Sequence, residues 1–415
     1  MTIDLKALSE SVENLADVCT RCGMCQAICP VYKNTRMESD SARGKLTLVS
    51  ALHEEVTHSP RKTLNRLERC TLCGGCMATC PRGVSTVDAF LLARKALWEA
   101  GVLSGTKREL LRKAFADPAQ TASLAARFAA VQKRFVKEDK ARVASMGKYP
   151  VPKVRRPFLS ERALEESTSA KGPRVLLFSG CLVDKAYSFV GEGLVGLLQE
   201  AGAQVEIPEG QGCCGVPLLS GGDFEGFSQA VKAHLPLFDP SSIDYIVTPC
   251  ATCTHTLKVL WPKADEGLDE SEMALAQAIS KKVMDGGELL AMLGREAQEP
   301  VGDLSELTVT IHDPCHSRHS LKNTESVREL VRRCGCRLVE MEPGCCGLGG
   351  SFGISHRDLS LEIGQSCLDR MEATGADLVV TTCPGCMAQI ESLLKTSGSS
   401  MRVRHAVELF TEEFS

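Results

Sequence analysis

The stretch Cys19-Thr20-Arg21-Cys22-Gly23-Met24-Cys25-Gln26-Ala27-Ile28-Cys29-Pro30 decides how the N-terminal part of the chain folds. It reads C-x2-C-x2-C-x3-C-P, and the same spacing recurs once, at Cys70, Cys73, Cys76, Cys80 and Pro81. Three thiolates two residues apart can surround one metal cluster from a single turn of loop, whereas the fourth lies too far along the chain to close that cluster. The proline fixes φ and turns the chain away.

This is the spacing of bacterial ferredoxins with two [4Fe-4S] clusters, in which the fourth Cys of each run ligates the other cluster. We therefore predict one cubane bound by Cys19, Cys22, Cys25 and Cys80, and a second bound by Cys70, Cys73, Cys76 and Cys29. Zinc is the weaker alternative, because it favours pairs of C-x2-C over triplets. Disulfides are typical of small secreted chains.

The composition is that of an ordinary globular protein with unusually many thiols. Of the 415 residues, 43% are hydrophobic, 24% are charged and 21 are Cys. The N-terminus lacks a basic region followed by an apolar run, so no signal peptide is expected. No stretch approaches the roughly 18 consecutive apolar residues of a membrane span. Many Cys without a secretion signal predict a cytoplasmic protein whose thiols bind metal.

Residues 104–160 are strongly basic, although the net charge of the chain is −4. They contain 14 Lys or Arg against 4 Asp or Glu, which gives a net charge of +10. Such a segment can face an acidic partner or the inner membrane surface, and a solvated helix face is an equally good alternative. It lacks a base-stacking aromatic pattern, so nucleic acid is not expected as a partner. The candidate contact residues are Lys133, Arg134, Lys137 and Lys140.

The N-terminal part is predicted to be a helical domain, residues 1–103, wrapped around the two clusters. Apolar spacing and capping residues predict helices over residues 5–18, 40–52, 60–69 and 84–100. Residues 104–172 are predicted to join this domain to the rest. They hold charged helix up to residue 145 and an extended, proline-rich linker over residues 147–157.

After the linker, buried strands alternate with helices, which predicts domains of the α/β class with parallel sheets. Strands are expected at residues 174–178, 204–207 and 244–248, and again at residues 307–311, 337–340 and 377–381. The spacing between Cys residues also repeats, so we interpret the two halves as an internal duplication. The predicted domains are residues 173–300, which include an acidic helical insertion over 254–300, and residues 301–415.

Each repeat carries five Cys at the predicted carboxyl ends of strands, where parallel sheets collect ligands. The first predicted metal site is Cys181, Cys213, Cys214, Cys250 and Cys253, and the second is Cys315, Cys345, Cys346, Cys383 and Cys386. Glycine after each Cys pair lets the backbone approach a bulky group. This density of thiolates favours an iron–sulfur cluster. A redox-active dithiol and a structural zinc are the alternatives.

Five further residues could bear on these sites. Cys334, Cys336 and Cys367 are interpreted as buried or surface thiols. His316 and His319, beside Cys315, are expected to donate to a cluster's surroundings or to face solvent rather than to ligate it, because the thiolates already suffice.

The whole chain resembles the iron–sulfur subunit of glycolate oxidase and its relatives, the lactate-utilisation and anaerobic glycerol-3-phosphate dehydrogenase iron–sulfur subunits. The resemblance is carried by the two Cys runs, both Cys-Cys-Gly (CCG) repeats and the stretches Ser41-Ala42-Arg43-Gly44-Lys45, Leu67-Glu68-Arg69-Cys70 and Cys80-Pro81-Arg82-Gly83-Val84. The repeats also resemble the catalytic subunit of heterodisulfide reductase, where such Cys sets hold non-cubane [4Fe-4S] clusters. The resemblance implies one or two further clusters at the CCG sites.

The resemblance also implies electron transfer from a separate FAD-bearing 2-hydroxy acid dehydrogenase subunit to a quinone or another acceptor, with the glycolate type closest. No G-x-G-x-x-G follows a strand and no P-loop occurs, so the flavin is expected on the partner. We therefore predict no catalytic residue here, and no oxidation of substrate by this chain alone. The alternative is an enzyme that reduces a disulfide at a CCG cluster. A non-redox scaffold is disfavoured by the cubane spacing.

The two predicted cubanes set an iron content. Anaerobically prepared protein should hold about eight iron atoms in its first hundred residues, because each cubane contains four. Cys22→Ser and Cys73→Ser should each remove one cluster, which metal analysis and iron–sulfur absorbance would measure. Zinc in place of iron under anaerobic conditions would contradict the prediction.

Overall fold

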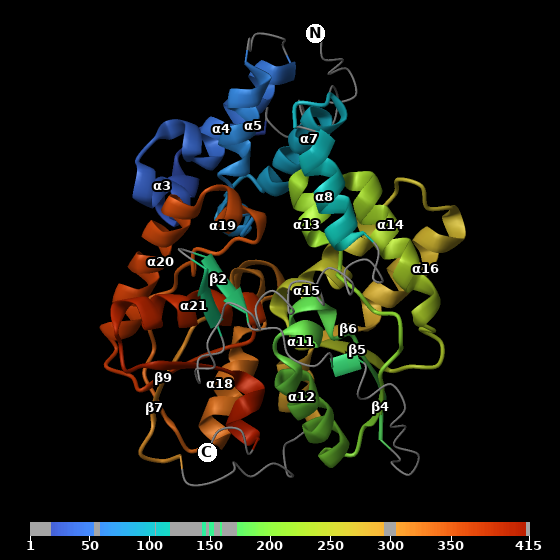
Figure 1. The fold of residues 1–415 in the computed structure, drawn as a ribbon, viewed down its shortest axis with the longest axis vertical. Helices are drawn as coiled ribbons and strands as arrows, with labels where there is room; N and C mark the ends of the chain where they lie inside the picture. The colour runs from blue at the N-terminus through green and yellow to red at the C-terminus, as the bar shows by residue number, and fades with distance from the viewer. Residues whose placement is uncertain are drawn as a thin grey trace.

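The structure, a computed structural model, describes residues 18–53, 59–103, 105–116, 143–146, 149–152, 158–159, 172–293 and 304–411. A helical N-terminal part lies at one end of the molecule, and two α/β halves lie side by side below it (Figure 1). Among the described helices, none has the length and apolarity needed to cross a membrane. The helix expected over residues 5–18 and the basic residues Lys133, Arg134, Lys137 and Lys140 lie outside the described residues.

Short helices joined by tight loops build the N-terminal part. They are α2 (Met24–Ile28), α3 (Pro30–Thr35), η2 (Glu38–Asp40), α4 (Ala42–His53), α5 (Pro60–Glu68), α6 (Gly75–Ala78), α7 (Thr86–Glu99) and α8 (Gly105–Phe115). Proline at the first position starts α3 and α5, where a missing N–H is harmless. Leu52, Leu67 and Leu97 are fully buried between the longer helices. The helices predicted over residues 40–52, 60–69 and 84–100 are confirmed within two residues at their ends, apart from a 3-10 turn over Glu38–Asp40 before α4.

Two parallel sheets form the α/β halves. Within the described residues, the first has the order β4-β3-β5-β6, from β3 (Arg174–Leu177), β4 (Gln204–Glu206), β5 (Tyr245–Thr248) and β6 (Val283–Asp285). The second has the order β8-β7-β9-β10, from β7 (Thr308–Ile311), β8 (Arg337–Leu338), β9 (Leu378–Thr381) and β10 (Arg402–His405). Corresponding strands occupy corresponding places, which confirms the internal repeat.

Helices flank both sheets. In the first half they are α11 (Gly180–Lys185), α12 (Ser188–Glu200), α13 (Val216–Gly221), α14 (Phe224–His234), α15 (Ala251–His255), α16 (Glu270–Lys282) and α17 (Gly286–Leu293), with shorter turns η3 (Leu235–Leu237), η4 (Thr256–Leu260) and η5 (Trp261–Lys263). In the second half they are α18 (Thr324–Arg333), α19 (Ser351–Ser355), α20 (Arg357–Glu372) and α21 (Pro384–Ser397), with turns η6 (Ser317–Leu321) and η7 (Ala406–Phe410).

The interpretation of residues 254–300 as an insertion is wrong. Their segment Val283–Asp285 is strand β6, which pairs in parallel with β5 so that Val283 lies opposite Ile246. The strand has 3 residues and lies directly between α16 and α17 with no loop on either side, so the sequence analysis included it in a helical segment. The matching strand β10 was also missed, because only a helix was expected after Cys386.

The sequence prediction is also wrong between residues 143 and 152. Strands β1 (Val143–Met146) and β2 (Tyr149–Pro152) form an antiparallel hairpin where charged helix and then an unpaired linker were expected. The hairpin was missed because it contains Pro150 and Pro152, and proline is accepted in sheets only on edge strands. Both strands of this two-stranded sheet are edge strands, so both can contain proline.

Alternation along the strands divides the interior into two cores. Val175 and Leu177 face one core, and Leu176 and Phe178 face the other. The first core also contains Val309, Ile311 and other residues of the second sheet, so the two sheets share it. The second core contains most of the CCG cysteines. Both cores contain residues of both sheets, and together they fix the two sheets relative to each other.

Arg94 of α7 joins the N-terminal part to the first half. Its guanidinium is buried and donates hydrogen bonds to the backbone oxygens of Leu67 and Cys70, and across the boundary to that of Ser220 at 2.7 Å. The backbones also approach closely here, since a Cβ on Gly222, whose φ is +94°, would lie 2.5 Å from the Arg94 oxygen.

We expect Arg94→Ala to lower the free energy of unfolding by on the order of 3 kcal/mol, because buried carbonyl groups lose their donor. The matched control is Lys263→Ala. Lys263 joins the same helix to the same half through Asp88 at 3.1 Å, but both side chains are substantially exposed, so the expected loss is below about 1 kcal/mol. Denaturant unfolding followed by tryptophan fluorescence measures both. Equal losses would contradict the assignment of Arg94 as the main link.

Candidate iron–sulfur sites

The first cavity of the N-terminal part is surrounded by the cysteines predicted for the first cubane. Cys19, Cys22, Cys25 and Cys80 line it, and Cys76 touches its edge. Left-handed backbone at Arg21 (φ 55°) and Gly23 (φ 86°) turns the loop so that successive thiols face inward. The structure therefore brings Cys80 of the second run to the first three cysteines of the first run.

The second cavity is lined by Cys29, Cys70, Cys73 and Cys76, the four cysteines predicted for the second cubane. Its loop repeats the same backbone turn, with Leu72 at φ 53° and Gly74 at φ 76°. Burial raises the pKa of the Cys29 thiol to about 12. Because a bound metal cation reverses such a shift, this thiol is suited to ligation rather than to free ionisation. The ligand roles of all eight cysteines remain a prediction.

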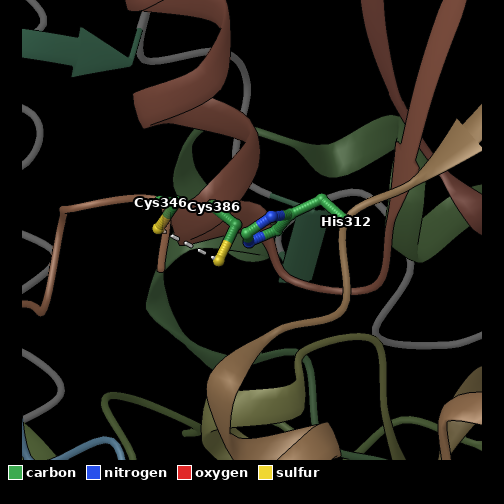
Figure 2. A group of neighbouring side chains, drawn as sticks. All are labelled: His312, Cys346 and Cys386. Carbon is green, nitrogen blue, oxygen red and sulfur yellow. Dashed lines mark hydrogen bonds between the residues drawn. The ribbon is translucent and has the colours of Figure 1, made fainter. Parts of the chain in front are cut away.

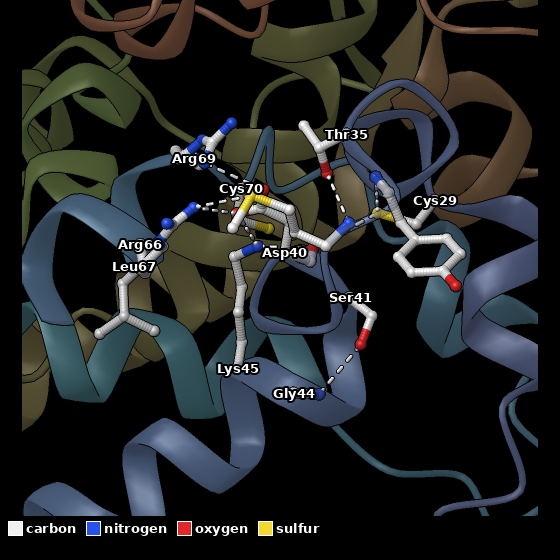
Figure 3. A network of polar contacts seen from close by, with 12 residues as sticks. Cys29, Thr35, Asp40, Ser41, Gly44, Lys45, Arg66, Leu67, Arg69 and Cys70 are labelled. Atoms are coloured by element: carbon white, nitrogen blue, oxygen red, sulfur yellow. Dashed lines mark hydrogen bonds and ion pairs between the residues drawn. The ribbon is translucent and has the colours of Figure 1, made fainter.

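Buried charge beside the second cavity tests whether a cluster fits there (Figure 3). Lys45 lines the cavity, is 1% exposed and donates from Nζ to the backbone oxygen of Asp40 at 2.6 Å. The buried Asp40 carboxylate also faces Arg69 at 3.0 Å and Arg66 at 3.5 Å. One carboxylate thus faces three cations, and the region has an excess of positive charge.

A four-iron cluster with four thiolate ligands is an anion, and its net charge and surroundings set its potential. The four-thiol donor set and the positive charge beside the second cavity both fit such a group. The first cavity differs, because Arg43 at its edge is partly exposed and paired with Glu38 at 2.6 Å. The two cavities therefore offer a cluster different electrostatic environments.

The ten CCG cysteines all line one cavity of about 230 Å³. Within the first repeat, thiol contacts run in the order Cys181, Cys213, Cys214, Cys253 and Cys250. Within the second repeat they run in the order Cys383, Cys386, Cys346, Cys345 and Cys315. Each predicted set thus converges, and the two sets meet where Cys250 contacts Cys383.

The loops that follow strands β5 and β9 hold the two sets together. The backbone N–H of Ala251 donates to the oxygen of Thr382 at 3.1 Å. The hydroxyl of Thr252 lies 3.7 Å from the sulfur of Cys383. In parallel sheets, loops at the carboxyl ends of the strands meet at one edge. Here the edges of two sheets face each other, so one space serves both sets.

Cys73 connects the N-terminal part to this cavity. Its thiol contacts that of Cys315, and the residue lines both the second cavity and the large CCG cavity. Contacting thiols therefore extend without a break from the second cubane site through the second CCG site to the first.

Two histidines named from the sequence lie near this cavity. His316 stacks on His255 at 4.4 Å between ring centroids, and its Nδ1 lies 3.2 Å from the hydroxyl of Thr252. Burial lowers the pKa of His255 to about 3, so the stacked pair is held without charge on that ring. His319 lies over Gly75 of the second cluster loop. Their roles near a cluster remain a prediction.

Sequence reasoning missed His312. It is 1% exposed, directly follows β7 and lies with Cys346 and Cys386 in one buried group (Figure 2). Aligning the two repeats would have revealed it, because Phe178 holds the corresponding place three residues before the first Cys. Of the remaining cysteines, Cys334 and Cys336 are buried in contact with each other, and Cys367 is fully buried beside His312.

Comparison with known proteins places these features in a family. The 4Fe-4S dicluster domain family matches residues 15–84, and the cysteine-rich CCG domain family matches residues 175–258 and 309–391. Lactate utilization protein A of Shouchella clausii is 30% identical over 246 residues, which cover 58% of this chain and 99% of the relative. The chain belongs to the family of iron–sulfur proteins with CCG domains.

Two other relatives match nearly the whole chain. The "Probable glycolate oxidase iron-sulfur subunit" of Bacillus subtilis is 27% identical over 418 residues, covering 95% of this chain and 93% of the relative. One component of the fumarate reductase (CoM/CoB) of Methanothermobacter marburgensis is 26% identical over 408 residues, covering 96% of this chain and 72% of the relative. The resemblance drawn from the sequence is confirmed, and this CCG-domain protein is an iron–sulfur subunit of the glycolate-oxidase and lactate-utilization type.

The charge beside the second cavity leads to a prediction about its reduction potential. Lys45→Met should lower the potential of the second cubane by on the order of 100 mV, because a buried positive charge near the cluster favours the reduced form. The control, Arg43→Met on the same helix, should change either cubane less, because Glu38 already neutralises Arg43. Redox titration followed by EPR measures both variants. A larger shift in Arg43→Met than in Lys45→Met would contradict this account.

Proposed function

We propose that this subunit relays single electrons from a partner subunit that contains FAD and oxidises glycolate or lactate, and passes them to a quinone or another acceptor. The observation that carries the proposal is the unbroken row of contacting cysteines from Cys73 through both CCG sites. Iron–sulfur clusters, when bound, accept and release one electron at a time, which complements a flavin that takes two from its substrate.

The chain's own residues would set the order of the sites. Cys76 lines both cavities of the N-terminal part, and Cys73 joins the second cavity to Cys315. The contact of Cys383 with Cys250 then leads to the first CCG site. This linear arrangement supports a relay with two ends. It would use two cubanes and further clusters at one or both CCG sites.

Exposure distinguishes the two ends of the row. Cys22 at the first cavity is exposed, and Met24 beside it is 55% exposed. Eight of the ten CCG cysteines are buried, and Cys181 and Cys315 are half-buried, so this end of the row is less exposed than Cys22. Exposed apolar side chains beside a redox site are typical of a surface for transient docking. We therefore place contact with a redox partner at the first cavity.

The names of the relatives supply the substrate class. They include a lactate utilization protein and a probable glycolate oxidase iron–sulfur subunit, which points to small 2-hydroxy acids. The hydroxy acid would bind to the partner that carries the flavin. The electron acceptor would then receive electrons from this subunit rather than from the flavoprotein. If the acceptor is a quinone, this transfer would take place at the membrane surface.

A specific observation favours a second candidate, reduction of a disulfide at the CCG site. The large cavity lies between the two Cys sets and has the apolar lining residues Leu182, Val216 and Leu348. The name of one relative, fumarate reductase (CoM/CoB), includes the coenzymes CoM and CoB, and the CCG repeats resemble the catalytic subunit of heterodisulfide reductase. In this alternative the cavity itself would receive a small disulfide.

Reconstitution with a flavoprotein partner tests the relay. Glycolate or lactate should bleach the iron–sulfur absorbance of this subunit, and give EPR signals, only when the partner is present. The control is partner alone, which should show reduction of flavin without these signals. The electrons must cross from flavin to cluster, so a matched Cys22→Ser subunit should be reduced more slowly.

Three outcomes would contradict the relay. Bleaching by the hydroxy acid without any flavoprotein would make this chain itself the dehydrogenase. Reduction of a small disulfide by the chemically reduced subunit alone, with clusters reoxidised in proportion, would favour the second candidate. Substrate turnover by the complex with clusters that stay oxidised would also exclude the relay.

A further inference from the structure

His312 lies where it can reach a metal centre at the second CCG site. A ring nitrogen of His312 and the sulfurs of Cys346 and Cys386 all lie within 4.8 Å of one another, and all three side chains are buried (Figure 2). The two sulfurs are 3.4 Å apart. Imidazole nitrogen and thiolate sulfur are both ligands of iron and zinc. The three side chains therefore form a donor set rather than a chance contact with one cysteine.

Cys367 fixes the orientation of the His312 ring. Its sulfur lies 3.7 Å from Nδ1 of His312, on helix α20. Nε2 is buried and has no hydrogen-bond partner among the residues that the structure describes. With the Nδ1 proton directed at the sulfur, Nε2 carries a free lone pair, because the bond made by one ring nitrogen decides which atom binds a metal. An unpaired buried nitrogen is unfavourable unless another group satisfies it.

In the first repeat, the position that corresponds to His312 is occupied by a side chain that only packs in the core. Phe178 follows β3 as His312 follows β7, and its ring packs against His234 at 5.4 Å between centroids. Both nitrogens of His234 are satisfied, by the N–H of Gly212 at 2.8 Å and by the oxygen of Ala230 at 2.6 Å. A phenyl ring thus fills the corresponding place in the first repeat, whereas the second repeat has a ring with an unpaired nitrogen.

The cysteines of the second set also leave room for this ligand. Cys315, at one end of the set, contacts Cys73 of the neighbouring cubane site. His312 lies beside the middle of the set, with Cys346 and Cys386. A metal centre bound by Cys346 and Cys386 would therefore lie nearer to His312 than to Cys315.

We propose that His312 is a nitrogen ligand of an iron–sulfur centre at the second CCG site, and that Cys367 positions it. The first CCG site, with Phe178 in the corresponding place, has thiolate ligands only. This inference rests on the proposed function and requires a cluster at the second CCG site. Neutral imidazole in place of thiolate raises the potential of an iron–sulfur centre, so the second site would have the higher potential of the two.

Isotope-edited pulsed EPR tests the proposal on the full-length protein, prepared anaerobically and reduced. Protein labelled with 15N only in histidine should show a strongly coupled nitrogen on one centre beyond the two cubanes. His312→Phe, which copies the first repeat, should lose this coupling and retain both cubane signals as evidence that the protein is folded. The wild-type spectrum requires no variant, so poor folding of His312→Phe cannot decide the result.

Control variants separate His312 from the other ring in the cavity. His316→Asn should keep the coupling, and Cys367→Ala should change its strength, since the ring loses its orienting contact. A CCG centre without strongly coupled histidine nitrogen would overturn this inference and leave the relay standing. The same result follows if the coupling persists in His312→Phe or disappears in His316→Asn. Zinc, or no metal, at both CCG sites would overturn this inference together with the CCG part of the relay.

Discussion

Thiol side chains from distant parts of the chain must meet, and the rest of the structure depends on that requirement. Eleven cysteines form a row through the interior, from Cys73 to Cys181, in which each thiol contacts the next. Parallel strands make this possible, because each delivers its loop to the same edge of its sheet. The duplication provides two sets of five thiols. The core shared by the two sheets holds both sheet edges against one cavity.

The buried charges of the N-terminal part are also arranged around the thiols. Buried thiols alone would resist ionisation, as the raised pKa of Cys29 shows. Beside them the chain buries Lys45 and Arg94 and holds Arg69 against the buried Asp40. Unpaired buried cations are unfavourable, and so are unpaired thiolates. Each becomes tolerable when an anionic cluster with its thiolates lies next to the cations, so the stability of the N-terminal part and its capacity for a cluster are linked.

Spacing alone predicted which cysteines gather, because the C-x2-C-x2-C-x3-C runs and the CCG repeats are local patterns tied to strand ends and loops. The fourth strand of each sheet was missed, because Val283–Asp285 lies directly between two helices and Arg402–His405 follows the last helix, where no further strand was expected. Nor was the common cavity, because the facing of two sheets depends on long-range contacts such as that of Ala251 with Thr382. His312 was missed because its partners Cys346 and Cys367 are 34 and 55 residues away.

The buried link through Arg94 also borders the CCG cavity. Its guanidinium joins the second cluster loop to Ser220, and the backbone of Gly222 lies against it with no room for a side chain. Ser220 and Thr71 of the cluster loop both line the CCG cavity. The contact that holds the N-terminal part to the first half therefore also forms one wall of that cavity, so a cluster bound there would be shielded on this side by the joint itself.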